Sequence, residues 1–157
     1  MRSGRGDKSA IARIGGMLRG RLIACLAVLA VGLSMAGCGG AIKRDELERG
    51  VATLGATAEE GRLLGRDVTR DRSKNTFVRV QARVLADQTD HEAEKLADAA
   101  AVGGVASIKS RAVKLAQDIS VALRDLQVYP GDRATAGQVA GRLTKLAGDA
   151  RVLEEEL

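Results

Sequence analysis

Aromatic residues are almost absent from this sequence. It has no tryptophan, and Phe77 and Tyr129 are its only phenylalanine and tyrosine. A hydrophobic core must therefore be built from leucine, valine, isoleucine and alanine. Such side chains suit helices that approach one another closely better than the facing sheets of a sandwich. The 157 residues leave room for one such domain once the N-terminal segment is set aside.

Cysteine and histidine are equally scarce, which limits the chemistry available. Cys25 lies in an apolar segment that we expect to be removed, so Cys38 would be the only remaining thiol and no internal disulfide is expected. A serine or threonine nucleophile would have only His91 as its base, and no glycine-rich elbow to present it. Neither a phosphate-binding loop nor a dinucleotide fingerprint occurs. The sequence therefore predicts a protein that is not an enzyme and needs no cofactor.

The basic character of the chain is confined to its beginning. The formal net charge is +5, from 25 basic and 20 acidic residues, but six of the basic residues and only one acid precede Cys38. The remainder thus carries 19 residues of each sign. Because the mature part is formally neutral and lacks aromatics on which bases could stack, we expect no nucleic-acid partner.

The N-terminal segment has the organisation of an export signal. An uncharged, mostly apolar stretch over residues 22–37 follows Arg19 and Arg21, and it ends in Met35-Ala36-Gly37-Cys38. This ending resembles the lipobox of bacterial lipoproteins. The resemblance implies that Cys38 is diacylated, that signal peptidase II cuts before it, and that the protein is held on the cell membrane, facing outside the cytoplasm. Residues 1–37 would be the signal peptide, 38–43 the lipid-attachment cysteine with a short linker, and 44–157 a helical domain.

Two other interpretations of this segment are open. Residues 22–42 carry no charge and are long enough to span a bilayer, which needs roughly 20 apolar residues. An uncleaved signal anchor is the alternative, although the glycines in this stretch and the well-placed cysteine favour cleavage. Translation could also start at Met17, because Met17 to Arg21 would form a compact basic region by themselves.

Beyond Lys43, apolar residues recur at intervals of three and four, which places them on one face of a helix. We predict helices over residues 44–70, 76–101, 105–128 and 132–156, of similar length and joined by short turns, and hence an all-α, up-and-down four-helix bundle. The expected core positions are Leu47, Val51, Leu54, Ala58, Gly61, Gly65 and Val68; Phe77, Val80, Val84, Leu85, Ala93, Leu96 and Ala100; Val105, Ile108, Ala112, Leu115, Ile119, Ala122, Leu126 and Tyr129; and Ala136, Val139, Leu143, Leu146, Ala150, Leu153 and Leu157.

Three breaks separate the predicted helices. Pro130-Gly131 and Gly103-Gly104 are strong turn signals, whereas residues 71–75 are polar but contain neither glycine nor proline. The alternative fold therefore joins the first two helices into one long helix over 44–101, packed with a helical hairpin. Continuing the first stripe would put Arg72, Asn75 and Arg79 in the core, so we favour a turn.

Two pairs of glycines stand four residues apart within predicted helices, Gly61 with Gly65 and Gly137 with Gly141. This spacing permits a close approach of two helices, within the chain or between chains. We favour the interpretation that these pairs only reflect a general enrichment of glycine and alanine. If Gly61 and Gly65 have a role, we expect it to be helix packing and not a membrane contact.

The only histidine has acidic neighbours on its helix face, Asp87 four residues before and Glu94 three residues after. Such a row could touch a divalent metal, but ferritin-like bundles need Glu-x-x-His motifs from two helices plus further carboxylates, and this chain has no such motif. We expect His91 to be a solvated surface residue and predict no metal site. A metal-binding or small-ligand-binding helical lipoprotein is the alternative function.

A cluster of basic residues around the turn at 71–75 is the best candidate binding site. Arg62, Arg66, Arg70, Arg79 and Arg83 dominate this region, together with Arg72 and Lys74. In a bundle anchored at Cys38 this turn would point away from the membrane. The sequence therefore predicts a non-enzymatic interaction or structural module that binds an anionic envelope polymer or an acidic protein there. The alternative is that these arginines only complement a helix dipole.

Overall fold

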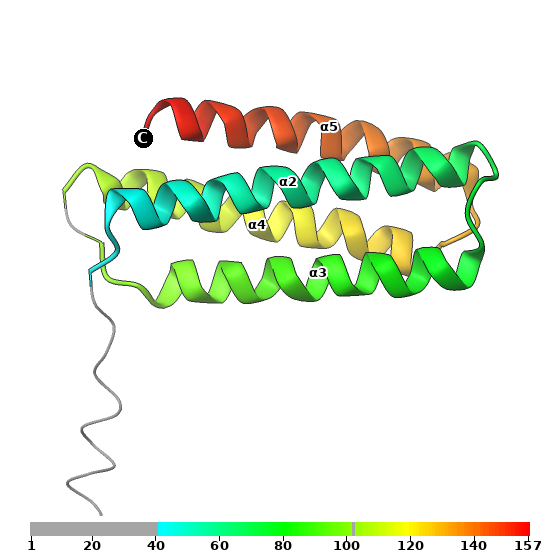
Figure 1. Ribbon diagram of the computed structural model, residues 1–157, viewed down its shortest axis with the longest axis horizontal. Coiled ribbons are helices and arrows are strands. Elements are labelled where there is room, and N and C mark those ends of the chain that lie inside the picture. Colours follow the sequence, from blue (N-terminus) through cyan, green and yellow to red (C-terminus); the bar gives the residue numbers. More distant parts are fainter. Residues whose placement is uncertain (1–40, 102) are drawn as a thin grey trace, which may run out of the picture. The chain divides into compact units, whose positions relative to one another are not determined.

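A computed structural model describes residues 41–101 and 103–157 of the chain, so the predicted signal peptide and the lipobox with Cys38 lie outside the described residues. Four helices make up the described part: α2 (Arg44–Thr69), α3 (Asn75–Asp98), α4 (Val105–Val128) and α5 (Arg133–Glu155). They form an up-and-down four-helix bundle (Figure 1). The predicted fold is therefore confirmed, and the long-helix alternative is wrong. Across these helices, no stretch is apolar enough over a sufficient length to cross a membrane.

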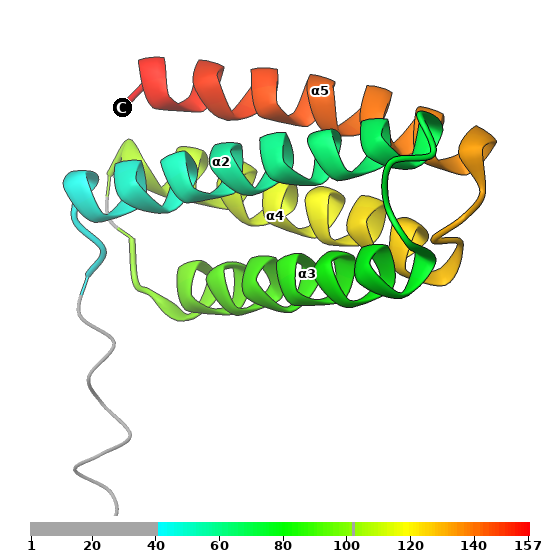
Figure 2. The ribbon, with the colours of Figure 1, turned by 45° about the vertical axis from the view of Figure 1, so that its right-hand side comes forward.

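The helices associate as two close pairs. α2 packs most extensively on α5, and α3 on α4, while the contacts between α4 and α5 and between α2 and α3 join the pairs. Figure 2 shows the same arrangement from a second side. Because neighbouring helices run antiparallel, the turns gather at two opposite ends of the bundle (Figure 1). We call the end formed by the α2–α3 and α4–α5 turns the basic end. The opposite end, with Ala41–Lys43, the α3–α4 connection and the C-terminus, is the entry end.

The core on α2 and α5 consists of the residues that the sequence predicted. All seven expected positions on each of these stripes are buried, from Leu47 to Val68 and from Ala136 to Leu157. On α4 the expected positions from Ala112 to Leu126 are buried as well, whereas Val105 and Ile108 are half-buried. Regular steps of three and four, without a polar interruption, are what made these three faces predictable.

The predicted core face of α3 is wrong in its first half. Phe77, Val80 and Val84 are exposed, with 57%, 57% and 42% of their surface accessible. The side chains that face the core are those of Val78, Ala82, Leu85, Ala86, Thr89, Ala93 and Leu96. This face includes a threonine, whose buried hydroxyl donates to the Leu85 carbonyl oxygen over 2.7 Å and so leaves no unpaired polar atom.

Gly61 and Gly65 bring α2 close to its neighbours. A Cβ on Gly61 would lie 2.5 Å from a methyl carbon of Leu123 and 2.9 Å from one of Leu143, and a Cβ on Gly65 would lie 3.0 Å from the Ala136 carbonyl oxygen. Gly141 has nothing within 4 Å of its Cβ position. The first pair of glycines therefore serves packing within the bundle.

The α2–α3 turn ends a helix without glycine or proline. Asp71 adopts a φ of 58°, the left-handed conformation, and the amide of Arg72 donates to the Asp67 carbonyl oxygen over 2.9 Å. The amide of Asp71 donates to the Val68 carbonyl oxygen over 3.0 Å. These two bonds form a Schellman motif, which satisfies carbonyls at the C-terminus of α2. Aspartate adopts the left-handed conformation more readily than most residues. This segment can therefore form a turn although it contains neither glycine nor proline.

The α4–α5 turn relies on Asp132. Its carboxylate accepts from the amides of Ala134 (3.1 Å) and Thr135 (3.2 Å), as an N-cap does. The hydrogen bond from the Thr135 hydroxyl, followed by those from the two amides, lowers the pKa of Asp132. Helix α5 therefore begins at Arg133, one residue later than predicted.

The α3–α4 connection is tied to the residues that precede α2. The amide of Ile42 donates to the Ala100 carbonyl oxygen over 2.7 Å, and Ala41 and Ala100 form a short parallel bridge. Ala99 is already extended, with a ψ of 131°, so α3 ends at Asp98 rather than at the predicted residue 101. Ile42 is 6% exposed and belongs to the core. The chain is therefore fixed to the bundle from its first described residues.

Candidate functional site

The basic end is built from two turns that touch. The guanidinium of Arg133 at the start of α5 lies 2.9 Å from the carboxylate of Asp71 in the α2–α3 turn. A Cβ on Gly131 would lie 2.6 Å from the side-chain nitrogen of Asn75, at the first residue of α3. The two turns thus form one continuous surface at the right-hand end of the bundle in Figure 1.

Two of the five predicted arginines are engaged locally. Arg62 donates to the Glu59 carboxylate over 2.6 Å, and Arg83 lies 3.6 Å from Asp87, four residues later. Arg66, Arg70 and Arg79 are exposed, and within the described residues they have no carboxylate within 4.0 Å. Together with the exposed Arg72 and Lys74 of the turn, these arginines supply the positive charge available to a partner at this end.

The structure does not bring all five arginines onto one face. Arg66 lies two helical turns after Glu59, whose carboxylate contacts Arg151 of α5 over 3.3 Å, so it belongs to the side of α2 that borders α5. Arg83 lies two turns before Asp90, which is hydrogen-bonded to Arg124 of α4, so it belongs to the side of α3 that borders α4. The arginines therefore flank the basic end from two sides.

Helix dipoles account for only some of these charges. Arg66 lies in the last turn of α2 and Arg70 is its C-cap, where positive charge is favourable. Helix α3 instead begins with Lys74 at its N-cap, without an acidic residue in its first turn, and Arg79 follows in the second turn. Positive charge near a helix N-terminus is unfavourable. The α3 side of the basic end therefore has a surplus of positive charge that the fold does not use.

Both aromatic side chains of the protein are exposed at this end, which sequence reasoning missed. Phe77 in the first turn of α3 is 57% exposed, and Tyr129 after α4 is 56% exposed. Both were expected in the core because their spacing from neighbouring apolar residues continues the predicted stripes. The alternative stripe from Val78 to Leu96 was present in the sequence, but Thr89 and three alanines made it inconspicuous.

The acidic and histidine side chains of α3 do not form a metal site. His91 and Glu94 are exposed, and Asp87 is paired with Arg83. Between residues 41 and 157, Val102 apart, no group of three or more histidine, cysteine, aspartate or glutamate side chains is placed to hold a metal ion. Nearby, Asp90 bonds to Arg124: its partial burial raises the pKa, but hydrogen bonds from Ser120 and Arg124 outweigh this and lower it. These charges hold α3 to α4.

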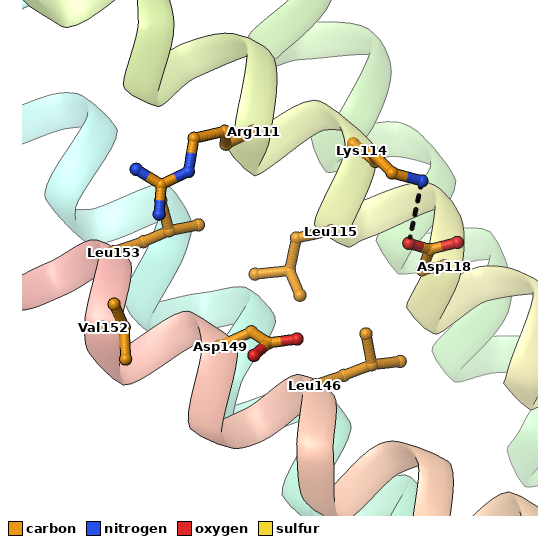
Figure 3. Close-up of a pocket in the computed structure, with 8 residues that line it drawn as sticks. All are labelled: Arg111, Lys114, Leu115, Asp118, Leu146, Asp149, Val152 and Leu153. Atoms are coloured by element: carbon orange, nitrogen blue, oxygen red, sulfur yellow. Dashed lines mark hydrogen bonds and ion pairs between the residues drawn. The ribbon is translucent and has the colours of Figure 1, made fainter.

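A shallow pocket of about 230 Å³ lies between α4 and α5 (Figure 3). Its floor is apolar, from Leu115, Leu146 and Leu153, and its rim carries charges of both signs. The rim carboxylates face cations: Asp118 lies 3.3 Å from Lys114 and 3.7 Å from Arg142, and Asp149 lies 3.9 Å from Lys145. No serine, threonine, cysteine or histidine is among the residues that line this pocket.

The C-terminal residues close the entry end beside this pocket. Arg111 donates to both carboxylate oxygens of Glu156, the longer bond measuring 2.9 Å. These hydrogen bonds lower the pKa of Glu156 and raise the pKa of Arg111. The acidic end of α5 is thus partly neutralised by α4.

Comparison of the whole chain with protein-family models, with curated proteins and with solved structures gives no match.

Proposed function

We propose that this protein is a lipid-anchored protein of the bacterial envelope that presents the basic end of its bundle to an anionic partner. The proposal rests on one observation: the point where the chain enters the bundle and the unpaired arginines lie at opposite ends of it. The chain enters the bundle at Ala41 and Ile42, which are bonded to Ala100 at the entry end. The unpaired Arg66 and Arg70 lie in the last turn of α2 and at its C-cap, and Arg79 lies in the second turn of α3, so all three are near the basic end.

Membrane attachment is supported by the lipobox-like ending at Cys38. Only Gly39 and Gly40 separate Cys38 from Ala41, and the three steps from one Cα to the next cover at most about 11 Å in extended chain. A diacyl anchor holds a protein stably on a membrane. The entry end would therefore face the lipid, and the basic end would face away from it.

The partner is argued from charge and exposed apolar surface. Exposed arginines that no carboxylate neutralises favour a polyanion, either a phosphate-bearing polymer or an acidic protein face. Phe77 and Tyr129 add apolar contact area of the kind that binding surfaces use. Such a module acts by binding rather than by catalysis.

Fatty-acid labelling of the precursor tests the anchor. We expect label on the wild-type protein and a mass shift from removal of residues 1–37, and neither on Cys38→Ala. An unlabelled wild-type protein would contradict membrane attachment through Cys38.

Retention on a polyphosphate column and on a polyglutamate column tests the basic end. The variant carries Arg66→Gln, Arg70→Gln and Arg79→Gln, and the control carries Arg44→Gln, Arg49→Gln and Arg151→Gln, which removes the same charge from other sites. We expect the first variant to elute at lower salt than wild type, and the control to elute at higher salt than the first variant. Equal shifts in both variants would show that net charge, not the basic end, determines retention.

A further inference from the structure

The α3–α4 connection at the entry end differs in composition from ordinary surface loops. From Ala99 to Ile108 no residue is charged, and the stretch consists of alanine, valine, glycine, one serine and isoleucine. Connections between helices are usually polar, because they are exposed to water. Here Ala100, Gly103, Gly104 and Ala106 are exposed.

The first charge after this stretch is turned inward. Lys109 is half-buried, and its ammonium donates to the carbonyl oxygens of Ala97 (2.8 Å) and Ala99 (2.6 Å). These bonds satisfy carbonyls at the C-terminus of α3. The surface of the loop therefore stays uncharged even beside Lys109.

A shallow apolar hollow adjoins the loop. Gly104, Val105, Ile108 and Leu157 line it together with Arg44 and Glu156, and its volume is about 250 Å³. The Glu156 carboxylate is bonded to Arg111. The entry end thus combines an uncharged loop with apolar side chains that are only partly covered.

The short stretch of chain between Cys38 and Ala41 indicates what covers this surface. The chain leaves the bundle at Ala41, whose bridge partner Ala100 belongs to the loop itself. Cys38 is covalently within about 11 Å of that point. If Cys38 is acylated, its lipid enters the bilayer beside the loop.

We infer that the α3–α4 connection, with the exposed residues Ala100, Gly104 and Ala106, is a second membrane contact that rests on the bilayer surface next to the lipidated cysteine. This inference depends on the proposed acylation of Cys38. The anchor supplies the affinity, so even a weak apolar contact orients the bundle, because it forms within one molecule at high effective concentration. The loop buries no charge when it reaches the interface, which keeps the cost of the contact low.

The lipid class follows from the charges around the loop. Charges of both signs surround it: Lys43 and Arg44 lie at the start of α2, whereas Asp98 and Glu155 are the last residues of α3 and α5. A surface rich in anionic lipid would attract the first two groups and repel the other two, so it offers no net gain. We therefore expect the contact to form on zwitterionic phosphatidylcholine vesicles and to be no stronger when phosphatidylglycerol is added.

The test uses single-cysteine variants of the full chain, expressed with lipidation and reconstituted in vesicles. Acylation blocks the thiol of Cys38, and Cys25 leaves with the signal peptide, so an introduced cysteine takes a fluorescent label alone. Ala106→Cys probes the loop side, in the first turn of α4. Thr76→Cys is the matched control, an exposed position in the first turn of α3 at the basic end.

We expect an aqueous collisional quencher to lose roughly half or more of its effect at Ala106→Cys on vesicles, as an interfacial position requires, and to keep its full effect at Thr76→Cys. Ala100→Cys is the second loop position, should labelling at residue 106 disturb the fold. Equal quenching at the loop and at Thr76, or protection of Thr76 alone, would overturn the membrane contact.

Mass spectrometry of the same preparations separates the two ways of failing. An acylated protein with an unprotected loop refutes the second contact and leaves the lipoprotein proposal intact. A protein without the acyl mass refutes the lipoprotein proposal and, with it, the membrane contact.

Discussion

At the scale of single residues, aspartate takes the place at the α2–α3 turn that glycine occupies at many helix C-termini. Asp71 holds a φ of 58° and closes the Schellman motif through the amide of Arg72. Only a few residue types besides glycine adopt this conformation readily, because their short polar side chains interact locally with the backbone. The turn therefore depends on backbone conformation at one residue more than on the composition of its neighbours.

Replacing Asp71 by alanine should destabilise the protein by about 1 kcal/mol, because alanine pays the full strain of the left-handed conformation. Asp71→Asn should be close to wild type, since asparagine tolerates this conformation. Both variants lose the exposed ion pair with Arg133, so their difference in free energy of unfolding, measured by urea denaturation, isolates the backbone term. Equal stability of the two variants would show that φ at residue 71 does not limit the fold.

At the scale of elements, three of the four helix faces were predictable from the sequence and one was not. The stripes of α2, α4 and α5 repeat without interruption, so the periodicity alone identifies their buried sides. On α3 the larger side chains of Phe77, Val80 and Val84 outweighed the true face, which relies on alanines and on Thr89. Size and hydrophobicity are properties of a residue, whereas burial depends on which helices it meets. The sequence alone does not contain that information for a weakly patterned helix.

Two valines on α3 provide a direct test of its orientation. Val78 is fully buried and Val80 is 57% exposed, although the sequence analysis assigned Val80 to the core. Val78→Ala should cost about 2 kcal/mol of unfolding free energy, from two lost methyl groups and the space they leave. Val80→Ala should change it by less than about 0.5 kcal/mol. Thermal or urea unfolding of the pair checks this, and the reverse order would mean that α3 is rotated.

Glycines of α2 and α5 also differ in how much space surrounds them. Gly61→Ala brings a methyl group into the side chains of Leu123 and Leu143, and we expect a net loss of about 1 kcal/mol, because overpacking exceeds the gain in helix propensity. Gly141→Ala meets nothing and should stabilise the protein by roughly 0.5–1 kcal/mol. Measured side by side, a stabilising Gly61→Ala would show that α2 is less closely packed than described.

The candidate site also shows what sequence can and cannot predict. The sequence correctly placed the arginines around one turn, because that needs only the helix boundaries. It could not show that Arg62 and Arg83 are paired locally, or that Arg66 and Arg83 border different helices. Those facts depend on rotation of each helix in the bundle, as does the exposure of Phe77 and Tyr129.

At the scale of the whole molecule, the proposed cleavage before Cys38 would change the net charge of the protein. The full sequence has a pI of about 9.6. Removal of residues 1–37 leaves 19 basic and 19 acidic residues. We expect the processed protein to focus close to neutrality, and Cys38→Ala, which is not processed, to stay strongly basic. A wild-type protein that focuses with the precursor would contradict cleavage at Cys38.

The bond between Ile42 and Ala100 has a mechanical consequence. A domain on a long linker would explore a large volume above the membrane, whereas a bundle held from Ala41 onward would stay close to the lipid if Cys38 is acylated, as proposed. Helix α2, with 26 residues, is about 39 Å long. The basic end would then lie at a nearly constant distance from the lipid, about the length of α2. Only partners that reach this distance from the membrane could bind it.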